Sequence, residues 1–371
     1  MGVSEVDARG AHAHEHLAVP DRQRGQVDEP ELLGAAELLD LDRAHAAGRL
    51  PPVRAARYAP DRMSLCVVGS IAFDAVESPF GERERMLGGS AVHFSLAASF
   101  FTDVRVVGPV GEDFGEDEYA VLHGRGVNTD DIETISGGKT FFWRGRYEYD
   151  LNTAHTEDTQ LGVFGDFEPK LSEASRAAET LFLANIQPDL QRQVNEQCEG
   201  AGLVGLDSMN LWIDTARDSL VQTIGGVDLV FMNDAELSML TGQSNLVRAA
   251  REVIAMGPRA VVAKQGGYGA ALFTPEGFFA LPAYPLETVH DPTGAGDSFA
   301  GGFLGYLASQ GEGAGEDEDV LRRAMAYGST LASFNVEEFG TERVQRLTRE
   351  EIDARFDDLR RMTTFGAVPS A

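Results

Sequence analysis

Short apolar segments alternate with helix-type patterns along most of this chain, beginning at Met63. The apolar segments are rich in Val, Leu and Phe, as buried strands are, and they lie at Leu65–Gly69, Val104–Val110, Thr180–Leu183, Leu203–Asp207, Val227–Met232 and Ala260–Lys264. Helical patterns lie between or after them, at Ala91–Phe101, Asp189–Gln197, Leu211–Thr223, Asn245–Ala255, Gly296–Ala308, Glu318–Phe334 and Arg349–Met362. This order predicts an α/β fold with a mostly parallel central sheet that helices cover on both faces.

One segment breaks the alternation. Residues Lys139–Asp150 carry Trp143, Tyr147 and Tyr149 among alternating polar residues, which predicts an antiparallel strand with one buried face. Because this strand is inserted between two α/β units, it fits a flap over a cleft, and it fits a simple edge hairpin equally well.

Residues 1–62 have a different composition from the rest of the chain. They are rich in Ala, Arg, His and acidic residues and contain no Lys, Phe, Trp, Cys or Ile. We expect the folded domain to begin near Met63, and residues 1–62 to be disordered or to reflect a start codon assigned too far upstream.

Charge narrows the classes of partner. Of the 371 residues, 59 are acidic and 31 basic, and the net charge of −28 disfavours binding to nucleic acid and to anionic membranes.

Two cysteines, Cys66 and Cys198, are too few for a disulfide framework or a four-cysteine zinc site. No run of eighteen apolar residues and no N-terminal signal pattern occur, so a cytoplasmic location is expected.

The chemistry is concentrated in the run from Asp291 to Gly302. Gly294, Ala295 and Gly296 open a predicted helix, where converging backbone N–H groups and the helix dipole form an anion hole. Asp297 follows in the first turn, and a carboxylate beside an anion hole is what phosphoryl transfer to a hydroxyl requires. The alternative is an aspartate that only caps the helix after a glycine-rich turn.

The sequence does not match the other common phosphate-binding motifs. Gly138-Lys139-Thr140 is similar to the end of a Walker A loop, but Glu133 stands where that motif needs glycine. No Gly-x-Gly-x-x-Gly opens a helix after the first strand, which disfavours a dinucleotide-dependent oxidoreductase. No His-Glu-x-x-His or Cys-x-x-Cys pattern occurs.

The run from Asp291 to Gly302 resembles the C-terminal signature of the ribokinase-like (PfkB) carbohydrate kinases. A second match is Gly88-Gly89-Ser90-Ala91 at the start of a helix, and the resemblance spans Ser64 to the last helix. It implies one ribokinase-like kinase domain over residues 63–371, with a small antiparallel β lid whose strands lie near 71–88 and 134–152. It also implies ATP-dependent transfer of the γ-phosphoryl group to a hydroxyl of a small sugar or nucleoside.

The resemblance implies a role for each matching position. Asp297 would be the catalytic base, and the amides of Gly294, Ala295 and Gly296 would stabilise the transferring phosphoryl group. The nucleotide and Mg²⁺ would be bound by Asn233, Glu236, Lys264, Gly266, Gly269 and Thr293, with Glu236 holding Mg²⁺ through water. Asp291, near the loop at Gly340, would hold K⁺ where a monovalent cation is used. The pair Asn233 and Glu236 fits a plain helix cap equally well.

The acceptor site departs from the family pattern. The resemblance assigns substrate binding to Asp74, Gly88, Gly89 and His93, but Ala72 and His93 stand where ribose-specific members carry asparagine. A site that lacks hydrogen-bond partners rejects the matching substrate strongly, so ribose itself is not expected. The aromatic residues of the inserted strand (Phe142, Trp143 and Tyr147, with Arg144) fit stacking on a nucleoside or a cyclitol, and they fit lid or homodimer packing equally well. A catalytically inactive ligand-binding member of the family is the remaining alternative.

Overall fold

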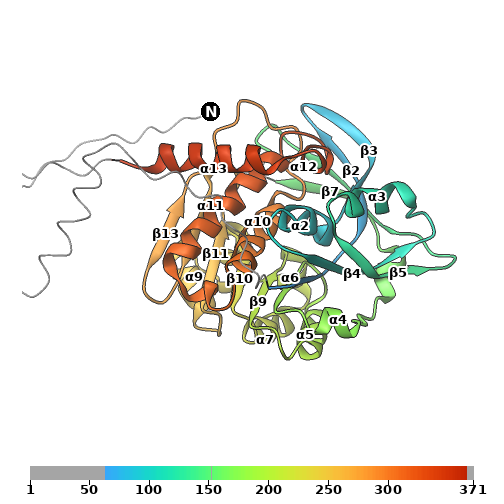
Figure 1. Cartoon of the computed structure of the whole chain (residues 1–371), viewed down its shortest axis with the longest axis horizontal. Helices are drawn as coiled ribbons and strands as arrows, with labels where there is room; N and C mark the ends of the chain where they lie inside the picture. The colour runs from blue at the N-terminus through green and yellow to red at the C-terminus, as the bar shows by residue number, and fades with distance from the viewer. Residues whose placement is uncertain (1–62, 152, 366–371) are drawn as a thin grey trace, which may run out of the picture. The chain divides into compact units, whose positions relative to one another are not determined.

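The computed structural model describes residues 63–151 and 153–365, and the expectations for residues 1–62 lie outside these ranges. The described part contains a large sheet flanked by helices and a second, smaller sheet (Figure 1). Cys66 and Cys198 are both buried free thiols. Within the described residues, no helix has the length and apolar character needed to cross a membrane.

The large sheet has nine strands and is mostly parallel, as the sequence predicts. All neighbours from β11 to β5 run parallel, and β12 and β13 add two antiparallel strands at one edge. The strand order is β13 (Phe278–Leu281), β12 (Ala270–Phe273), β11 (Ala260–Lys264), β10 (Leu229–Asn233), β9 (Leu203–Asp207), β8 (Thr180–Leu183), β1 (Leu65–Val68), β4 (Val104–Gly111) and β5 (Asn128–Ile135).

Side chains alternate between the two faces of this sheet and build two separate cores. In β1, Leu65 and Val67 join one hydrophobic cluster, whereas Cys66 and Val68 join the other. The first cluster includes residues of α2 (Ser90–Ala98), α10 (Ala295–Gln310), α11 (Glu318–Asn335) and α13 (Arg349–Thr363). The second includes residues of α5 (Pro188–Gln197), α7 (Arg217–Ile224), α8 (Asp234–Thr241) and α9 (Leu246–Ile254). Helices therefore cover both faces, as the uninterrupted apolar strands require.

The remaining helices are short, and one predicted helix is divided. The pattern at Leu211–Thr223 forms α6 (Asn210–Thr215) and α7, because Ala216 leaves the helical conformation at φ −140° and ψ 32°. The other helical segments are α3 (Glu116–Gly124), α4 (Glu173–Arg176), α12 (Glu342–Gln345) and the 3₁₀ turns at Gly162–Asp166, Gly266–Tyr268 and Ala314–Glu316.

The small sheet, which we call the lid, has the strand order β3 (Gly81–Gly88), β2 (Ala72–Ser78), β6 (Phe141–Tyr147) and β7 (Ala154–Gln160). Its two outer pairs are antiparallel, but β2 and β6 run parallel in the middle. The inserted segment at Lys139–Asp150 is thus an inner strand with partners on both sides, and the edge-hairpin alternative is wrong. Periodicity within one segment carries no information about this parallel partner, whose paired residues lie 69 positions earlier in the chain.

Candidate active site

The N-terminus of α10 presents free amides and a carboxylate. Gly294 is the N-cap residue with φ 74°, and Asp297 lies in the first turn, so the alternative in which Asp297 itself caps the helix is wrong. The N–H of Ala295 donates to the carbonyl of Pro292 at 3.2 Å. The N–H groups of Gly294 and Gly296 find no acceptor in the part of the chain that the structure describes. This end of the helix can therefore hold an anion through two unpaired amides and the helix dipole.

A cluster of charged side chains lies in front of this helix. Nζ of Lys264, the last residue of β11, donates to Oδ2 of Asp207, the last residue of β9, at 2.8 Å. Burial acts to lower the pKa of Lys264, but Asp207 and Glu236 together raise it above its usual value. Burial raises the pKa of Asp297 to about 7, with Asp207 adding to the rise and Lys264 opposing it. A carboxyl group that titrates near neutral pH suits a general base.

Asn233 and Glu236 form the helix cap that their spacing allows. The Asn233 side chain accepts from the N–H of Glu236 at 2.8 Å, and Oε2 of Glu236 accepts from the N–H of Asn233 at 2.7 Å. Burial raises the pKa of Glu236 to about 7, opposed by Lys264 and reinforced by Asp207. Glu236 therefore caps α8 and also belongs electrostatically to the charged cluster.

Asp74 lies buried on β2 against the glycine pair that precedes α2. A Cβ on Gly88 would lie 1.9 Å from Oδ2 of Asp74, so the carboxylate fills the space that this glycine leaves free. Gly89 has φ 95°. Burial raises the pKa of Asp74 to about 7, and the charge of Asp291 adds to this rise, while a hydrogen bond from the backbone of Gly89 opposes it. A buried carboxyl with spare acceptor capacity can bind substrate hydroxyls.

His93 is held in one protonation state by Asn335. Nδ2 of Asn335 donates to the carbonyl of Thr293 at 2.8 Å, which fixes the amide orientation. Its Oδ1 must then accept from the hydroxyl of Ser298 and from Nδ1 of His93, both at 3.0 Å. Burial lowers the pKa of His93, so the ring is neutral, with its proton on Nδ1. Nε2 is left as a buried acceptor that has no partner among residues 63–151 and 153–365.

The position of His93 is one reason why residue 294 has to be glycine. A Cβ on Gly294 would lie 2.3 Å from the imidazole ring, closer than any real contact, and its φ of 74° disfavours a side chain. The histidine that replaces the usual asparagine is therefore packed directly against the anion hole.

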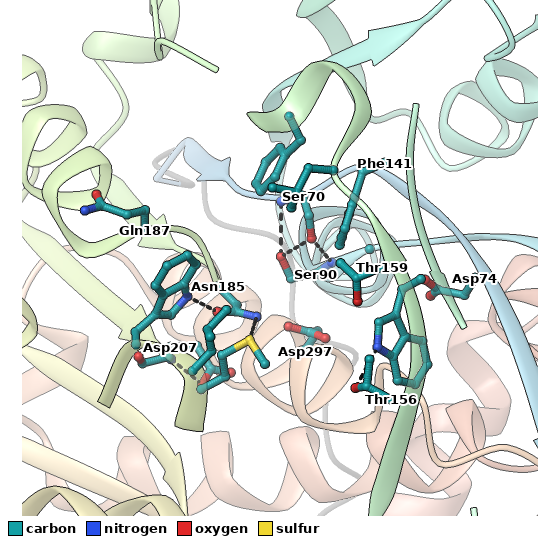
Figure 2. Close-up of a pocket in the computed structure, with 18 of the residues that line it drawn as sticks. Ser70, Asp74, Ser90, Phe141, Thr156, Thr159, Asn185, Gln187, Asp207 and Asp297 are labelled. Carbon is teal, nitrogen blue, oxygen red and sulfur yellow. Dashed lines mark hydrogen bonds between the residues drawn. The ribbon is translucent and has the colours of Figure 1, made fainter. Parts of the chain in front are cut away.

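These groups line one cavity of about 1130 Å³ (Figure 2). Of the residues predicted from the sequence, the cavity wall brings together Asp74, Gly89, His93, Lys264, Thr293, Gly294, Gly296 and Asp297. Seven predicted residues are not in that wall, namely Gly88, Asn233, Glu236, Gly266, Gly269, Asp291 and Ala295. Gly88, Asp291 and Ala295 adjoin lining residues in the chain, and Glu236 contributes to the cavity through its charge.

The inserted strand contributes one of its four proposed stacking residues. Trp143 lines the cavity, and its indole Nε1 donates to Thr156 on β7 at 3.1 Å. Phe142 packs against the core on the α2 side, whereas Tyr147 packs with Val76 of the lid and with Phe339, which follows α11. Arg144 faces Glu82 across the lid at 3.7 Å. A single alternating pattern cannot distinguish which of these positions faces a ligand.

Several polar and aromatic lining residues were missed in the sequence analysis, among them Asp207, Asn185 and Trp212. Asp207 ends β9 and Asn185 lies just after β8, at the carboxyl ends of neighbouring parallel strands. Trp212 on α6 donates its indole N–H to Oδ1 of Asn185 at 2.9 Å. The positions of Asn185, just after one predicted strand, and of Asp207, at the end of another, could have identified them, because ligands of open α/β sheets bind outside the carboxyl ends of the strands.

The lid is tied directly to the anion hole. The hydroxyl of Tyr147 on β6 lies 3.1 Å from Oγ1 of Thr293, and Ser78 on β2 donates to the carbonyl of His290 at 2.7 Å. Two inner strands of the lid therefore contact the loop that precedes α10.

The charged cluster fits Mg²⁺ held together with phosphate oxygens. Among the described residues, no group of three His, Cys, Asp or Glu side chains forms a ready-made metal centre. Mg²⁺ in kinases needs only one or two carboxylates plus phosphates and water. Asp207, Glu236 and Asp297 can meet this need. Burial raises the pKa of Glu236 and of Asp297, and the charge of Asp207 adds to both rises, so a bound cation would favour the ionised carboxylates.

Comparisons with known proteins agree with this geometry. The model of the pfkB family carbohydrate kinases matches residues 64–346. A cytidine kinase of Thermococcus kodakarensis is 29% identical over 257 residues, which cover 66% of this chain and 88% of that protein. The fold matches Burkholderia thailandensis nucleoside kinase in complex with inosine, at TM-score 0.64 and 21% identity, over 79% of this chain and 97% of that chain. It also matches a Methanocaldococcus jannaschii nucleoside kinase described as a ribokinase-family member, at TM-score 0.64 and 19% identity, over 81% and 100%.

Proposed function

Because this chain belongs to the pfkB family of carbohydrate kinases, which transfer phosphoryl groups to alcohols, we propose that its acceptor is a nucleoside. The size and the aromatic lining of the cavity are the observations that support this proposal. Its volume of about 1130 Å³ exceeds what one sugar ring needs, and it extends from Asp297 to the aromatic rings of Trp143 and Trp212. The similarity to a cytidine kinase supports the same class of acceptor.

Asp297 acts as the general base in this proposal. Its carboxylate takes the proton of the acceptor hydroxyl as that oxygen attacks the γ-phosphorus of ATP, and ADP leaves. The unpaired amides of Gly294 and Gly296, with Ala295 beside them, hold the transferring phosphoryl oxygens. Lys264 lies within reach of the same oxygens, because a Cβ on Gly296 would be 3.0 Å from its Nζ.

In this proposal the acceptor and the nucleotide bind on different sides of Asp297. We assign the acceptor hydroxyls to Asp74, Gly88, Gly89 and His93, and the nucleotide to Asn233, Glu236, Lys264, Gly266, Gly269 and Thr293. When bound, Mg²⁺ neutralises phosphate charge, and Glu236 would hold it through water. The kinase domain in this proposal comprises residues 63–371.

We assign a monovalent cation, K⁺, to Asp291. This carboxylate is fully buried, and its two oxygens accept from the N–H groups of Thr293 and Gly340, each at 2.9 Å. Within the described residues it forms no ion pair with Lys or Arg, and a buried carboxylate calls for a balancing charge. Activity in K⁺ should exceed that in tetramethylammonium at equal ionic strength, and equal rates in the two salts would remove this part of the proposal.

The lid also offers a surface for a homodimer. Its outer strands β3 and β7 each have one edge to which no other described strand pairs, and such edges pair readily across a two-fold axis. Light scattering of the purified protein would show twice the chain mass if the dimer forms, and the mass of one chain if it does not.

ADP release from Mg-ATP with a panel of nucleosides, simple sugars and cyclitols tests the main proposal. A nucleoside should stimulate release most, and Asp297→Asn should lower kcat by about 10²- to 10⁴-fold. The matched control is Asp218→Asn, which changes an exposed first-turn aspartate of α7 outside the cavity. Preferential turnover of a sugar or cyclitol would overturn the nucleoside assignment, and binding of Mg-ATP without any turnover would indicate an inactive ligand-binding member.

A further inference from the structure

The two amide side chains that follow β8 are fixed in orientation by their neighbours. Oδ1 of Asn185 accepts from the indole N–H of Trp212 at 2.9 Å, and Oε1 of Gln187 accepts from the N–H of Leu190 at 3.0 Å. Because an indole N–H and a backbone N–H are donors only, the atoms that face them must be the amide oxygens. The NH₂ groups of both side chains therefore point elsewhere.

These NH₂ groups lack full sets of acceptors. Within the part of the chain that the structure describes, Nδ2 of Asn185 donates only to the sulfur of Met209, at 3.1 Å, and a thioether is a weak acceptor. Nε2 of Gln187 donates one hydrogen to Asp189 at 2.7 Å and has a second hydrogen to give. Both residues line the cavity, whereas Ile186 between them is fully buried. This edge of the cavity wall thus has hydrogen-bond donor capacity.

The surroundings of this edge suit a flat, neutral group. The rings of Phe141 and Phe164 stack at 5.4 Å with an interplanar angle of 22° and line the same cavity. Exposed Asp166, Glu168 and Asp214 also belong to its wall. Because these carboxylates repel anions, the donor edge is poorly placed to bind a phosphate or a sugar acid.

We propose that Asn185 and Gln187 read the base of the nucleoside, and that they favour bases with two adjacent acceptor atoms. This inference rests on the proposed nucleoside kinase function. Cytosine offers O2 and N3, and hypoxanthine and guanine offer N7 and O6. Adenine places an amino group beside N7, so one donor of the protein would meet another donor, which leaves both unpaired.

Kinetics with four acceptors tests this inference. For the unchanged protein, kcat/KM with cytidine and with inosine should exceed that with adenosine by at least about 10-fold, the cost of one unpaired donor. Asn185→Asp keeps the size of the side chain and its bond to Trp212, but replaces the NH₂ group with oxygen. It should lower kcat/KM for cytidine and inosine by about 10- to 100-fold while adenosine changes little. Gln187→Glu should act in the same direction.

The control for added charge is Gln193→Glu, at an exposed position of α5 outside the cavity. It should leave the cytidine-to-adenosine ratio unchanged. The inference would be overturned if all variants had the same base preference, or if the unchanged protein preferred adenosine. Either result would leave the proposed nucleoside phosphorylation intact. Ribose 1-phosphate, the fourth acceptor, should be poor, and its preferential turnover would overturn both the base-reading edge and the nucleoside assignment.

Binding gives a readout that does not depend on turnover. The chain has two tryptophans, so Trp143→Phe leaves Trp212 as the only indole, hydrogen-bonded to Asn185. Cytidine should change the fluorescence of this variant at lower concentration than adenosine does. Equal concentrations for the two nucleosides would contradict base reading at Asn185.

Discussion

Three carboxyl groups of the active site keep their protons up to near pH 7. Burial raises the pKa of Asp74, Glu236 and Asp297 to about 7 each. A carboxyl group with a raised pKa in the folded state binds more protons than in the unfolded chain between about pH 4 and pH 7. The three groups therefore stabilise the fold at low pH, and this contribution is lost as the pH rises from about 4 to about 7. In the proposed mechanism Asp297 must be ionised to accept the proton, so activity should follow the opposite trend.

We expect kcat/KM to rise with pH up to about 7, while the melting temperature falls over part of the same range. Asp297→Asn removes the ionisation and should raise the melting temperature at pH 8 by a few degrees, with activity lost. Rate profiles and thermal unfolding between pH 5 and pH 8 measure both quantities. An acid limb centred near pH 4 would show that Asp297 titrates as an ordinary aspartate.

Asn335 is the buried residue on which most of the acceptor-side geometry depends. Asn335→Leu should destabilise the fold by about 2–4 kcal/mol, because the carbonyl of Thr293, the hydroxyl of Ser298 and Nδ1 of His93 each lose their partner. It should also raise KM for the acceptor more than KM for ATP. Chemical denaturation and steady-state kinetics measure these effects.

Asn195→Leu is the matched control for Asn335→Leu. The amide of Asn195 donates to one carbonyl, that of Gly226, and a loss below about 1 kcal/mol is expected. Equal destabilisation by the two substitutions would contradict the special role of Asn335.

The sequence placed the loop and first turn of α10 in the cavity wall at single-residue level, but it did not find every residue of that wall. Asp297 and its glycines form a local motif, since the loop and the first turn of the helix are contiguous in sequence. Asp207, Asn185 and Trp212 belong to three elements that meet only in the folded sheet. The side chain of Asn335, the last residue of α11, binds the loop carbonyl of Thr293, 42 residues earlier in the chain, a pairing that no local pattern encodes.

At the level of elements, the lid depends on a single hydroxyl for its contact with Thr293. Tyr147→Phe removes the 3.1 Å contact with Oγ1 of Thr293 and keeps the packed ring. We expect kcat/KM for the acceptor to fall by about 3- to 10-fold, as for one modest hydrogen bond, with little change in the melting temperature. Tyr149→Phe, at an 85% exposed position beside the same strand, is the control and should be neutral. Equal kinetics for the two variants would remove the proposed link between lid and anion hole.

Elements of the large sheet were predicted well because buried parallel strands are continuous apolar runs. The polar strand β5 was missed for the opposite reason, because Asp130, Asp131 and Glu133 interrupt its apolar positions. The edge strands β12 and β13 are apolar runs of four residues each, and they were missed although β12 is fully buried. The order of the lid strands follows from a long-range pairing between β2 and β6, which only the fold reveals.

The whole molecule repels its own phosphoryl donor. With a net charge of −28, approach of anionic Mg-ATP should be slow at low ionic strength. Raising tetramethylammonium chloride from about 10 mM to about 150 mM should raise kcat/KM for ATP by about two- to five-fold, since the Debye length falls to about 8 Å. A decrease in kcat/KM would indicate that the local field at Lys264 outweighs the global charge.

The scarcity of lysine makes the ion pair between Lys264 and Asp207 open to covalent footprinting. The chain has three lysines, and Lys139 and Lys170 are exposed, whereas Lys264 lies in the active site with 17% of its side chain accessible. An amine-specific acylating reagent should therefore mark the two exposed lysines first, without loss of turnover. Inactivation should then follow the slower acylation of Lys264, and ATP should protect this one amine, so peptide mapping would report nucleotide occupancy even when no acceptor is known.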